Sequence, residues 1–576
     1  MPDAGRGSLR GRRPVCSRRV ERIGAWGCVL IVVAAALLRF SGLDRLQPHQ
    51  PEPDSFLVLQ AELLREGRQP DIQQSEKGYY AYPLVLAHVL ALVPAAEANS
   101  ANVAEHVAVA SSEYVRARWL VAALALLLVP VTWLLARRFV DPLAALLAAL
   151  LVATSLLHLY FSQQARHHAP QASFALVALL AALQLRSRPT WRGYFVASAM
   201  AMLALGTLHS GWFALLPVLA AHSLRRRDAP RAPWWALAVP IAACAAAWFG
   251  FYPRSDALTE HGGAYDEGGH TLYLRDLDFS GFATSARILW ESEPGLTVLA
   301  AIGALWILGG ARAAWRAASE DRRRDLLVVL AYALPYAAAL AAYKETCDRM
   351  LLPLVPFLAL LGGVAASRAA ATVSSALRPV LLASAVAVPV FGALRYATVR
   401  GAPDTVEQCS AWIESHVADA RERILVSPGL TLPLASDAEA LANVGKDHAS
   451  RQRRWLRHQL DSGALSGARA LAPIPGKLLV GADLAKATAR LHAFLEESKP
   501  AWLVVEVSKY LRVNPLAAEL QRWAQTHGSC AATFQGEQEV WRFEPPIDYQ
   551  DVPHLFLRLS RATSFGPVIE IYRIER

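Results

Sequence analysis

The sequence is poor in cysteine, and its cysteines are not spaced for a metal site or a disulfide framework. Six cysteines occur among 576 residues, and no two of them form a CxxC pair. A zinc knuckle and a disulfide-rich scaffold are therefore excluded. Internal repeats are also absent, and no low-complexity tract follows the Arg-rich N-terminus, so a repeat protein and a largely disordered chain are excluded as well.

Charge is missing from many long segments of the chain. Hydrophobic residues make up 54% of the sequence, and they gather in runs of about 18 or more residues, the length at which a helix can cross a bilayer. The net charge of +10 could indicate nucleic acid, but the arginines form short clusters between the apolar runs, as they do in membrane proteins. We therefore exclude a nucleic-acid partner and predict a polytopic α-helical membrane protein.

The distribution of arginine predicts which apolar segments cross the membrane. Residues 79–94 are apolar but short; if they do not cross, the arginine clusters after the later spans all share the side of the basic N-terminus. We therefore expect 79–94 to form a juxtamembrane helix. No small-residue cleavage site follows the first apolar run, which we interpret as a retained span. The eleven predicted spans are 23–43, 114–136, 142–161, 169–185, 191–207, 209–224, 233–252, 295–310, 326–343, 350–366 and 379–394.

This topology divides the chain into three parts. Residues 1–22 form a basic cytoplasmic N-terminus, residues 23–399 a transmembrane domain with external loops 44–113 and 254–293, and residues 400–576 an external α/β domain. In the last part Asp404 and Glu407 form a capping box, and strand-like segments at 423–427, 477–481, 502–507, 539–543 and 567–574 surround helical patterns at 484–497 and 515–526. Cys409 and Cys530 would share this oxidising side, where a disulfide between them is possible.

Polar side chains gather at the expected outer ends of the helices. A carboxylate beside several cations at a bilayer surface suits a lipid phosphate together with proton abstraction from a hydroxyl or amine. Simpler explanations stay open for some of them: Arg116 and Arg118 could snorkel to headgroups, and the His167–His168 pair lacks a matching carboxylate for a metal site. The candidate site residues are Glu52, Asp54, Glu76, Lys77, Arg116, Tyr160, Arg166, His168, Lys344 and Arg349.

A series of short motifs gives these residues a common context. In chain order they are RFSGLD, EPDS, SEKGYY, ARWL followed by LARRF, LHLYFSQQAR and RMLLPLVPFLALL. The series resembles the GT-C membrane glycosyltransferases, close to the protein O-mannosyltransferases and the aminoarabinose transferase of lipid A (glycosyltransferase families 39 and 83), over residues 23–400. Three positions depart from the family pattern: Ser55 replaces a Glu, His168 an Asp and Met350 a Tyr.

The resemblance implies a GT-C-like fold of about 11 transmembrane helices plus juxtamembrane helices, and an inverting transfer from a polyprenyl-phosphate sugar to an acceptor lipid, glycan or protein. It implies Asp54 as the essential acid and Lys77 as a phosphate-binding cation, and it matches Arg166 and His168 to the family's R-P-D turn. No cofactor is required, with a divalent cation as an alternative, and no metal ligands are assigned. The expected location is the bacterial inner membrane, with the C-terminal domain in the periplasm.

In the mechanism that we predict, Asp54 would act as general base in a single displacement, with Glu52 as a possible second carboxylate. Lys77, Arg166 and Arg349 would hold the departing phosphate. A flippase or transporter of lipid-linked sugars, and an inactive scaffold with a periplasmic binding domain, are the alternatives. Charges at the outer helix ends, rather than at mid-span, argue against a transporter.

Overall fold

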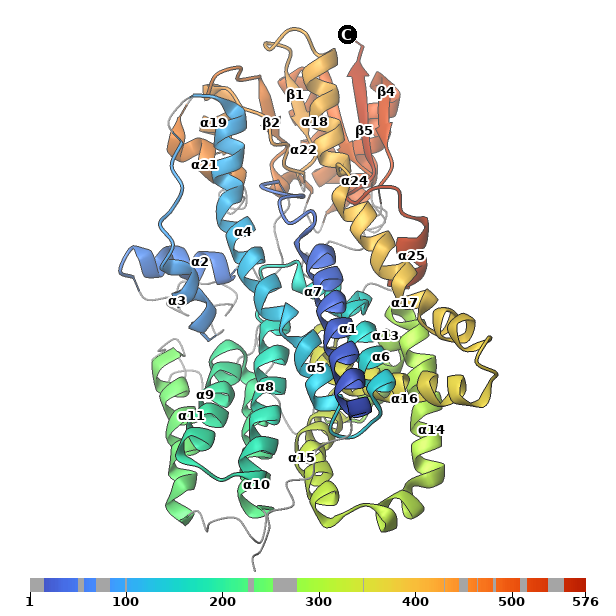
Figure 1. The fold of residues 1–576 in the computed structure, drawn as a ribbon. Coiled ribbons are helices and arrows are strands. Elements are labelled where there is room, and N and C mark those ends of the chain that lie inside the picture. Colours follow the sequence, from blue (N-terminus) through green and yellow to red (C-terminus); the bar gives the residue numbers. More distant parts are fainter. Residues whose placement is uncertain are drawn as a thin grey trace, which may run out of the picture.

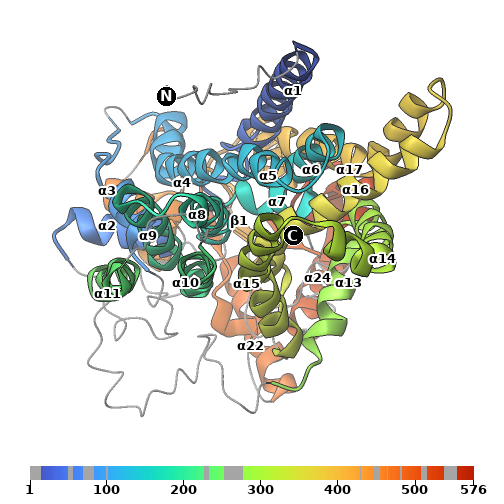
Figure 2. The same cartoon turned by 60° about the horizontal axis from the view of Figure 1, so that its bottom comes forward.

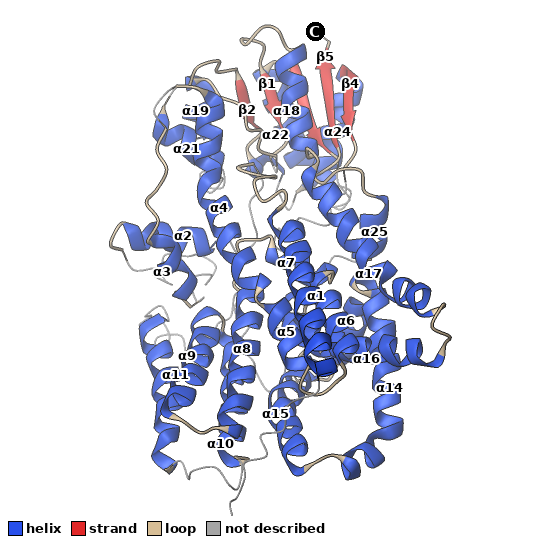
Figure 3. Cartoon of the chain, viewed as in Figure 1, coloured by secondary structure: helices blue, strands red, loops and turns tan. Residues whose placement is uncertain are grey.

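A computed structural model of the chain describes most of its residues. The described ranges are 15–49, 56–68, 83–98, 101–225, 233–251, 277–344, 346–428, 430–444, 454–463, 465–479, 483–507, 515–536 and 554–575; of residues 15–21, 56 and 234 only the backbone is described. The described chain has a helical part, from α1 to α17, and a part from α18 onward that carries all the described strands (Figures 1 and 3). We call these two parts the membrane domain and the C-terminal domain.

Helices occur at every position where the sequence predicts a span. They are α1 (Val15–Phe40), α4 (Val103–Leu126), α5 (Leu128–Ala136), α6 (Pro142–Ala153), α7 (Leu156–Ser162), α8 (His168–Ser187), α9 (Trp191–Thr207), η3 (His209–Ala214), α10 (Leu215–Ser223), η4 (Trp234–Leu237), α11 (Ala238–Phe251), α14 (Pro294–Ala317), α15 (Glu320–Ala342), η6 (Asp348–Leu354), α16 (Val355–Thr372) and α17 (Arg378–Gly401). A further helix, α13 (Gly281–Ser292), lies in the predicted loop 254–293.

By length and composition, seven described helices can cross a membrane, or eight if the bent pair α6–α7 counts as one span. The helix of Trp235–Phe251 is apolar but shorter. The predicted spans at 191–207 and 209–224 are helical, yet α9 has 17 residues and the second one begins as a 3-10 helix. The predicted number of eleven is therefore not confirmed.

The break between α6 and α7 has a local cause. Asp141 caps α6 and Pro142 follows at its first position, so an apolar run starts there as a helix. Ser155 then starts a new helix by accepting a hydrogen bond from the backbone N–H of His158, and the axis bends by 51°. The carboxylate of Glu293 binds the Ser155 hydroxyl at 2.5 Å and the Leu157 N–H at 2.8 Å. The bend carries α7 and the segment after it into the interior of the bundle.

The predicted arginine clusters lie together at one end of the bundle. Arg186 donates to Asp325 at 2.5 Å and to Asp321 at 3.2 Å, Arg324 donates to the carbonyl of Arg225 at 2.7 Å, and Arg322 donates to the carbonyl of Phe139. Seen from that end (Figure 2), α8 to α11 form one group of helices and α13 to α17 another; α5 contacts α8 and α16, and α6 packs on α16. The arginine clusters thus share one end of the bundle, and the topology in which 79–94 does not cross stays a prediction.

The first external loop carries two short helices, α2 (Phe56–Arg65) and α3 (Val85–Ala91). The segment predicted as a juxtamembrane helix is helical over Val85–Ala91, where α3 packs on α2, α4 and α9; its position at the membrane surface stays a prediction. Leu92, directly after it, is 84% exposed, as a lipid-facing side chain would be. These helices lie between the membrane bundle and the C-terminal domain (Figure 1).

The C-terminal domain is a five-stranded mixed sheet with helices on both faces. Its elements are α18 (Thr405–His416), β1 (Ile424–Val426), α19 (Ala438–Val444), α21 (Arg454–Ser462), β2 (Leu471–Pro473), η7 (Gly476–Leu479), α22 (Leu484–Ser498), β3 (Trp502–Glu506), α24 (Pro515–His527), β4 (Gly528–Phe534), α25 (Leu555–Arg561) and β5 (Ile569–Ile574). The strand order is β2-β1-β3-β5-β4. Strands β1, β2 and β3 are parallel, while β5 is antiparallel to β3 and β4.

Alternating side chains of the sheet build two cores. Ile424 and Val504 face α18, whereas Leu425 and Leu503 face α22 and α24, because successive residues of a strand point to opposite faces. The α/β prediction is confirmed, with two corrections. Residues 477–479 of the predicted strand at 477–481 belong to the 3-10 helix η7, and β2 and β4 were not predicted. The predicted strand at 539–543 lies outside the described residues.

The possible disulfide between Cys409 and Cys530 is not present. Both are free thiols. Cys409 is buried in the core beneath α18, while Cys530 is exposed on β4, where its Sγ lies 3.6 Å from the carbonyl of Ala532. The helix packs Cys409 inward as an apolar residue, which places it away from the exposed side of the edge strand.

Candidate functional site

Four of the candidate site residues lie outside the described part of the chain: Glu52, Asp54, Glu76 and Lys77. The candidate site residues that the structure describes are Arg116, Tyr160, Arg166, His168, Lys344 and Arg349.

Tyr160, Arg166, His168 and Arg349 come together in the interior of the membrane domain. They lie on α7, on the connection from α7 to α8, at the first residue of α8, and on η6, and these elements contact one another. All four are buried, with exposed fractions of 2%, 0%, 5% and 2%. Arg166 and His168 both lie against the ring of Phe161, at 5.5 Å and 6.3 Å from its centre. We call these four residues the central cluster.

One aromatic residue, Tyr396, and one acidic residue, Asp348, border the central cluster. The rings of Tyr160 and Tyr396 lie 6.4 Å apart, and Tyr396 extends from α17. Asp348, the residue before Arg349, is 7% exposed and accepts the backbone N–H of Arg349 at 2.7 Å. Guanidinium groups, tyrosine hydroxyls and a carboxylate thus share one buried region among apolar helices.

Arg116 and Lys344 lie elsewhere. Arg116 extends from α4 and donates to Glu113 at 3.0 Å and to the carbonyl of Pro94 at 2.5 Å. Lys344 is exposed, in the turn after α15. The structure therefore joins four of the six described candidates and separates these two from them.

Four further buried arginines were not predicted as site residues. One of them, Arg186, pairs with Asp321 and Asp325 at the arginine-rich end, and the other three are Arg39, Arg118 and Arg400. Arg39 donates to the carbonyls of Ala153 at 3.0 Å and Val152 at 3.2 Å, and lies 3.0 Å from His158 Nδ1. Arg118 and Arg400 are 1% exposed. The snorkelling explanation is thus wrong for Arg118, whose Nη1 donates to the carbonyls of Leu43 and Arg45 at 2.7 Å each.

No signal in the sequence separates these arginines from headgroup-facing ones, because an arginine near a span end fits both patterns. Arg118 and Arg400 contact backbone carbonyls just after α1, and Arg39, at the end of α1, contacts carbonyls at the end of α6.

The described buried groups of the membrane domain carry an excess of positive charge. Six arginines are buried there: Arg39, Arg118, Arg166, Arg186, Arg349 and Arg400. Of these, Arg186 is paired with Asp321 and Asp325. Of the buried carboxylates in this part of the described chain, Glu113 is paired with Arg65 and Arg116, and Glu293 caps α7, which leaves Asp348 beside the central cluster. An excess of guanidinium groups in an apolar bundle suits an anionic ligand.

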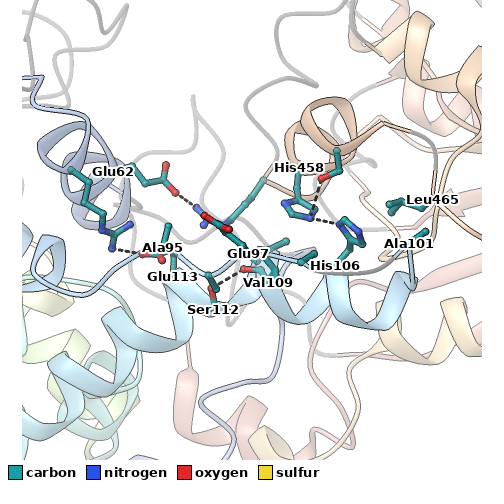
Figure 4. A pocket seen from close by; sticks show the side chains of 16 residues that line it. Glu62, Ala95, Glu97, Ala101, His106, Val109, Ser112, Glu113, His458 and Leu465 are labelled. Atoms are coloured by element: carbon teal, nitrogen blue, oxygen red, sulfur yellow. Dashed lines mark hydrogen bonds and ion pairs between the residues drawn. The ribbon is translucent and has the colours of Figure 1, made fainter.

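A cavity of about 720 Å³ lies where the C-terminal domain meets the first external loop (Figure 4). Its walls come from α2, α4, α21 and residues 95–98, and its charged or titratable lining residues are Glu62, Arg65, Glu97, His106, Glu113, Arg454 and His458. No residue of the central cluster lines it. Arg116 borders the cavity through its ion pair with Glu113.

His106 and His458 face each other across the boundary between α4 and α21 (Figure 4), with Nδ1 of the first 2.9 Å from Nε2 of the second. Burial lowers the pKa of His458 below its ordinary value of 6.5, and the nearby His106 and Arg454 lower it further, against the opposing effect of Asp461. A single shared proton satisfies this pair, because a second one would place two positive rings in contact.

Within the described residues, no group of three or more His, Cys, Asp or Glu side chains is arranged to hold a metal ion.

No family model and no curated protein matches the chain. Among solved structures, it is similar to the archaeal oligosaccharyltransferase AglB from Archaeoglobus fulgidus in complex with an inhibitory peptide and a dolichol-phosphate, with 12% identity, a TM-score of 0.45, and coverage of 88% of this chain and 72% of that chain. It is also similar to ArnT from Cupriavidus metallidurans in the apo state (14% identity, TM-score 0.43, 85% and 95% covered).

A third similar structure is ArnT bound to undecaprenyl phosphate, with 14% identity, a TM-score of 0.41, and 84% and 94% of the two chains covered. These proteins are GT-C glycosyltransferases. That is the class which the sequence motifs resemble. At such low identity and TM-score, the similarity carries no argument about activity or ligand.

Proposed function

We propose that this chain is an integral-membrane inverting glycosyltransferase. It moves a sugar from a polyprenyl-phosphate donor to an acceptor at the periplasmic face of a bacterial inner membrane. The observation that carries the proposal is the complete burial of Arg166 and Arg349 beside Tyr160 in an apolar helical bundle.

Burial of a guanidinium group is costly unless an anion compensates for it. Charged residues inside membrane helices accordingly mark ligand or ion sites by default. A phosphate is the anion whose geometry two arginines match best, through paired N–H donors. A lipid phosphate is favoured over a free one because the segments that carry these arginines, the connection from α7 to α8 and η6, pack among the apolar helices of the membrane domain.

The transfer step follows from these groups together with Asp54. The acceptor heteroatom forms a bond to the anomeric carbon while its proton passes to the carboxylate of Asp54. The bond from that carbon to the phosphate oxygen breaks, and the electron pair leaves with the polyprenyl phosphate. Lys77, Arg166 and Arg349 offset the charge that develops on the leaving group, so a metal ion is not required. One displacement inverts the anomeric configuration.

A transporter of lipid-linked sugars fits less well. It would place ionisable groups along a path near the middle of the spans. From Trp119 to Ala136, and through all of α6 and α7, the sequence has no Asp, Glu, Lys or Arg, and the charges of α14 and α15 lie near the arginine-rich end. An inactive scaffold would not require two arginines to be buried side by side with Tyr160.

Binding of undecaprenyl phosphate to the purified full-length chain in nanodiscs tests the proposal. Arg166→Ala and Arg349→Ala should each weaken binding by about tenfold to a hundredfold, the effect of losing a charged hydrogen bond. Arg378→Ala is the matched control, because Arg378 is exposed at the start of α17. Should the alanine variants fail to fold, Arg166→Lys and Arg349→Lys keep the charge and should retain part of the affinity. Unchanged affinity in folded variants would contradict the proposal.

A further inference from the structure

The short helix α7 sets the position of most of the central cluster. It carries Tyr160, and the segment that follows it carries Arg166. Phe161, on the same helix, has its ring centre 5.5 Å from the guanidinium of Arg166 and 6.3 Å from the ring of His168. A shift of α7 would therefore move Tyr160 and also the ring against which Arg166 and His168 lie.

The start of α7 is bound by Glu293, which lies at the junction of α13 and α14. One carboxylate oxygen of Glu293 accepts from the Ser155 hydroxyl at 2.5 Å and from the Leu157 N–H at 2.8 Å. The backbone of Glu293 is itself fixed, because its N–H donates to the carbonyl of Leu289 at 2.8 Å and its carbonyl accepts from the N–H of Thr297 at 2.9 Å. This carboxylate thus joins the junction of two distant helices to the first turn of α7.

The burial of Glu293 needs an explanation. Its exposed fraction is 3%, and no basic side chain in the described part of the chain pairs with it. A carboxylate in such surroundings is costly unless it is well hydrogen-bonded. Ser155 already caps α7 by accepting the N–H of His158 at 3.2 Å, so the helix can begin without a second cap from a distant element. We therefore attribute to Glu293 the placement of α7 rather than its formation.

The other end of α7 is bound to the end of α1. Gln163, directly after α7, is buried, and its Nε2 donates to the carbonyls of Leu38 at 2.7 Å and Ser41 at 3.1 Å. Arg39, next to Leu38, donates to two carbonyls at the end of α6. The chain is thus held from other elements on both sides of the break between α6 and α7, and Glu293 supplies the contact at the start of α7.

We propose that Glu293 is a positioning residue of the donor site: it sets the place of α7 and, through Phe161, that of Arg166. The inference rests on the proposed function, in which Arg166 and Arg349 bind the phosphate of the lipid. Arg349 lies on η6, outside the segment that Glu293 holds. The effect of Glu293 on phosphate binding should therefore pass through Arg166.

Two substitutions of Glu293 separate its hydrogen bonds from its charge. Glu293→Gln keeps an oxygen that can accept from Ser155 and Leu157, whereas Glu293→Leu has a similar size and leaves the Leu157 N–H without its acceptor. Glu320→Leu is the matched control, because Glu320 also lies at the start of a long apolar helix, α15, but is 60% exposed. Should Glu293→Leu fail to fold, Ser155→Ala removes the hydroxyl that Glu293 binds and takes its place.

Each variant is prepared as the full chain in nanodiscs. Binding of undecaprenyl phosphate, the melting temperature, and hydrogen exchange of peptides covering residues 154–168 are measured. The binding measurements are repeated in chains that also carry Arg166→Ala or Arg349→Ala. These double-mutant cycles distinguish the positioning of one arginine from a general loss of stability.

We expect Glu293→Leu to speed exchange of these peptides and to weaken binding by about tenfold, the effect of misplacing one charged hydrogen bond. The loss should again be about tenfold when Arg349→Ala is present. It should be less than about twofold when Arg166→Ala is present, because the group that Glu293 positions is then missing. Glu293→Gln should retain most of the affinity, and Glu320→Leu should match the wild-type chain.

Equal losses in the Arg166→Ala and Arg349→Ala chains would overturn the inference, because Glu293 would then act on the fold as a whole. Unchanged exchange and binding in folded Glu293→Leu would overturn it as well. If the wild-type chain does not bind undecaprenyl phosphate while exchange rises in Glu293→Leu, the proposed function fails and the placement of α7 by Glu293 stands.

Discussion

At the scale of single residues, the buried arginines of the membrane domain differ in their partners. Arg118 and Arg400 donate to backbone carbonyls of the turn after α1 and hold that turn. Arg39 donates to carbonyls at the end of α6, and Arg186 pairs with carboxylates of α15. Arg166 and Arg349 lie in the central cluster with Tyr160, where the proposed function places a phosphate.

The proposed base is tested most directly by Asp54→Asn, which keeps the side-chain shape and removes its basicity. Transfer should fall by about 10²–10⁴-fold, the usual effect of losing a general base, while binding of the lipid-phosphate sugar is retained. Lys77→Ala should instead weaken donor affinity along with the rate. Asp44→Asn serves as control, since Asp44 is exposed in the same external turn. Transfer and melting temperature are both measured on purified variants.

Glu52→Gln separates the two carboxylates of the loop. A small effect on transfer leaves Asp54 as sole base, whereas a large one assigns the role to Glu52. Near-normal transfer by Asp54→Asn would rule out the mechanism, and a lower melting temperature with normal transfer would give Asp54 a structural role.

A second prediction concerns Gly42. Its φ is +67°, and a Cβ there would lie 2.9 Å from the carbonyl oxygen of Arg400. Gly42→Ala should destabilise the protein by more than the roughly 1–2 kcal/mol that a left-handed residue costs, because the contact adds to the strain. Gly67→Ala isolates the strain, since Gly67 has φ +70° and open space around it. Equal melting temperatures for the two variants would contradict the close approach.

The sequence predicted the residues of the central cluster, but it did not predict that Arg116 and Lys344 lie apart from them. Tyr160, Arg166 and His168 are close in the chain, so a polar turn after a span brings them together. Arg349 joins them through η6, as its motif implies. Arg116 was grouped with them because it also lies at an expected outer end of a helix. A helix carries its side chain to whichever face the packing selects, and α4 turns Arg116 toward Glu113 and Pro94.

At the scale of elements, the boundary between α4 and α21 is the most informative. α4 begins well before its predicted span at 114, and its first turns pack Val103, Val107 and Ala110 against Trp455 and Leu465. The sequence predicted the apolar span but not this extension, because residues 103–113 alternate small, polar and apolar side chains without a membrane-like run. Strands β2 and β4 were not predicted because neither has a clear strand pattern in the sequence: β2 ends in proline and β4 is a mostly exposed edge strand.

This boundary should weaken in mild acid. The pKa of His458 is lowered in the folded protein, so the unfolded chain binds more protons and stability rises with pH. The contribution is complete above the ordinary pKa of 6.5 and is lost as pH falls below it. Hydrogen exchange of α21 should therefore rise between pH 7 and pH 5 relative to the rest of the C-terminal domain.

The variant His458→Gln should remove this difference, because glutamine hydrogen-bonds without titrating. His416→Gln is the control, since His416 lies exposed at the end of α18 and stacks on Trp412. An acid response that persists in His458→Gln would assign it to other groups.

At the scale of the whole molecule, the basic clusters gather at one end and the C-terminal domain lies at the other. Arg186 contacts Asp325 and Arg324 contacts the carbonyl of Arg225 at the first end, and α18 and the sheet lie at the second (Figure 1). The number of spans could not be fixed from sequence. Short helices such as α9 and the η3–α10 pair cover less than a membrane thickness, and their role depends on neighbours that hydropathy does not reveal.

The topology is tested by single cysteines placed at positions 137 and 414. Arg137 belongs to the arginine-rich end and Glu414 to α18, the first helix of the C-terminal domain, so the positive-inside rule puts them on opposite sides of the membrane. Glu414 is exposed, whereas Asp404 at the start of the same helix is buried, so Glu414→Cys is the better reporter of the outer side. In intact cells, an impermeant thiol reagent should label Glu414→Cys and leave Arg137→Cys unlabelled until the membrane is opened. A native background from exposed Cys530 is removed by Cys530→Ser. Labelling of Arg137→Cys in intact cells would reverse the orientation and place the central cluster at the wrong end of the bundle for a periplasmic acceptor.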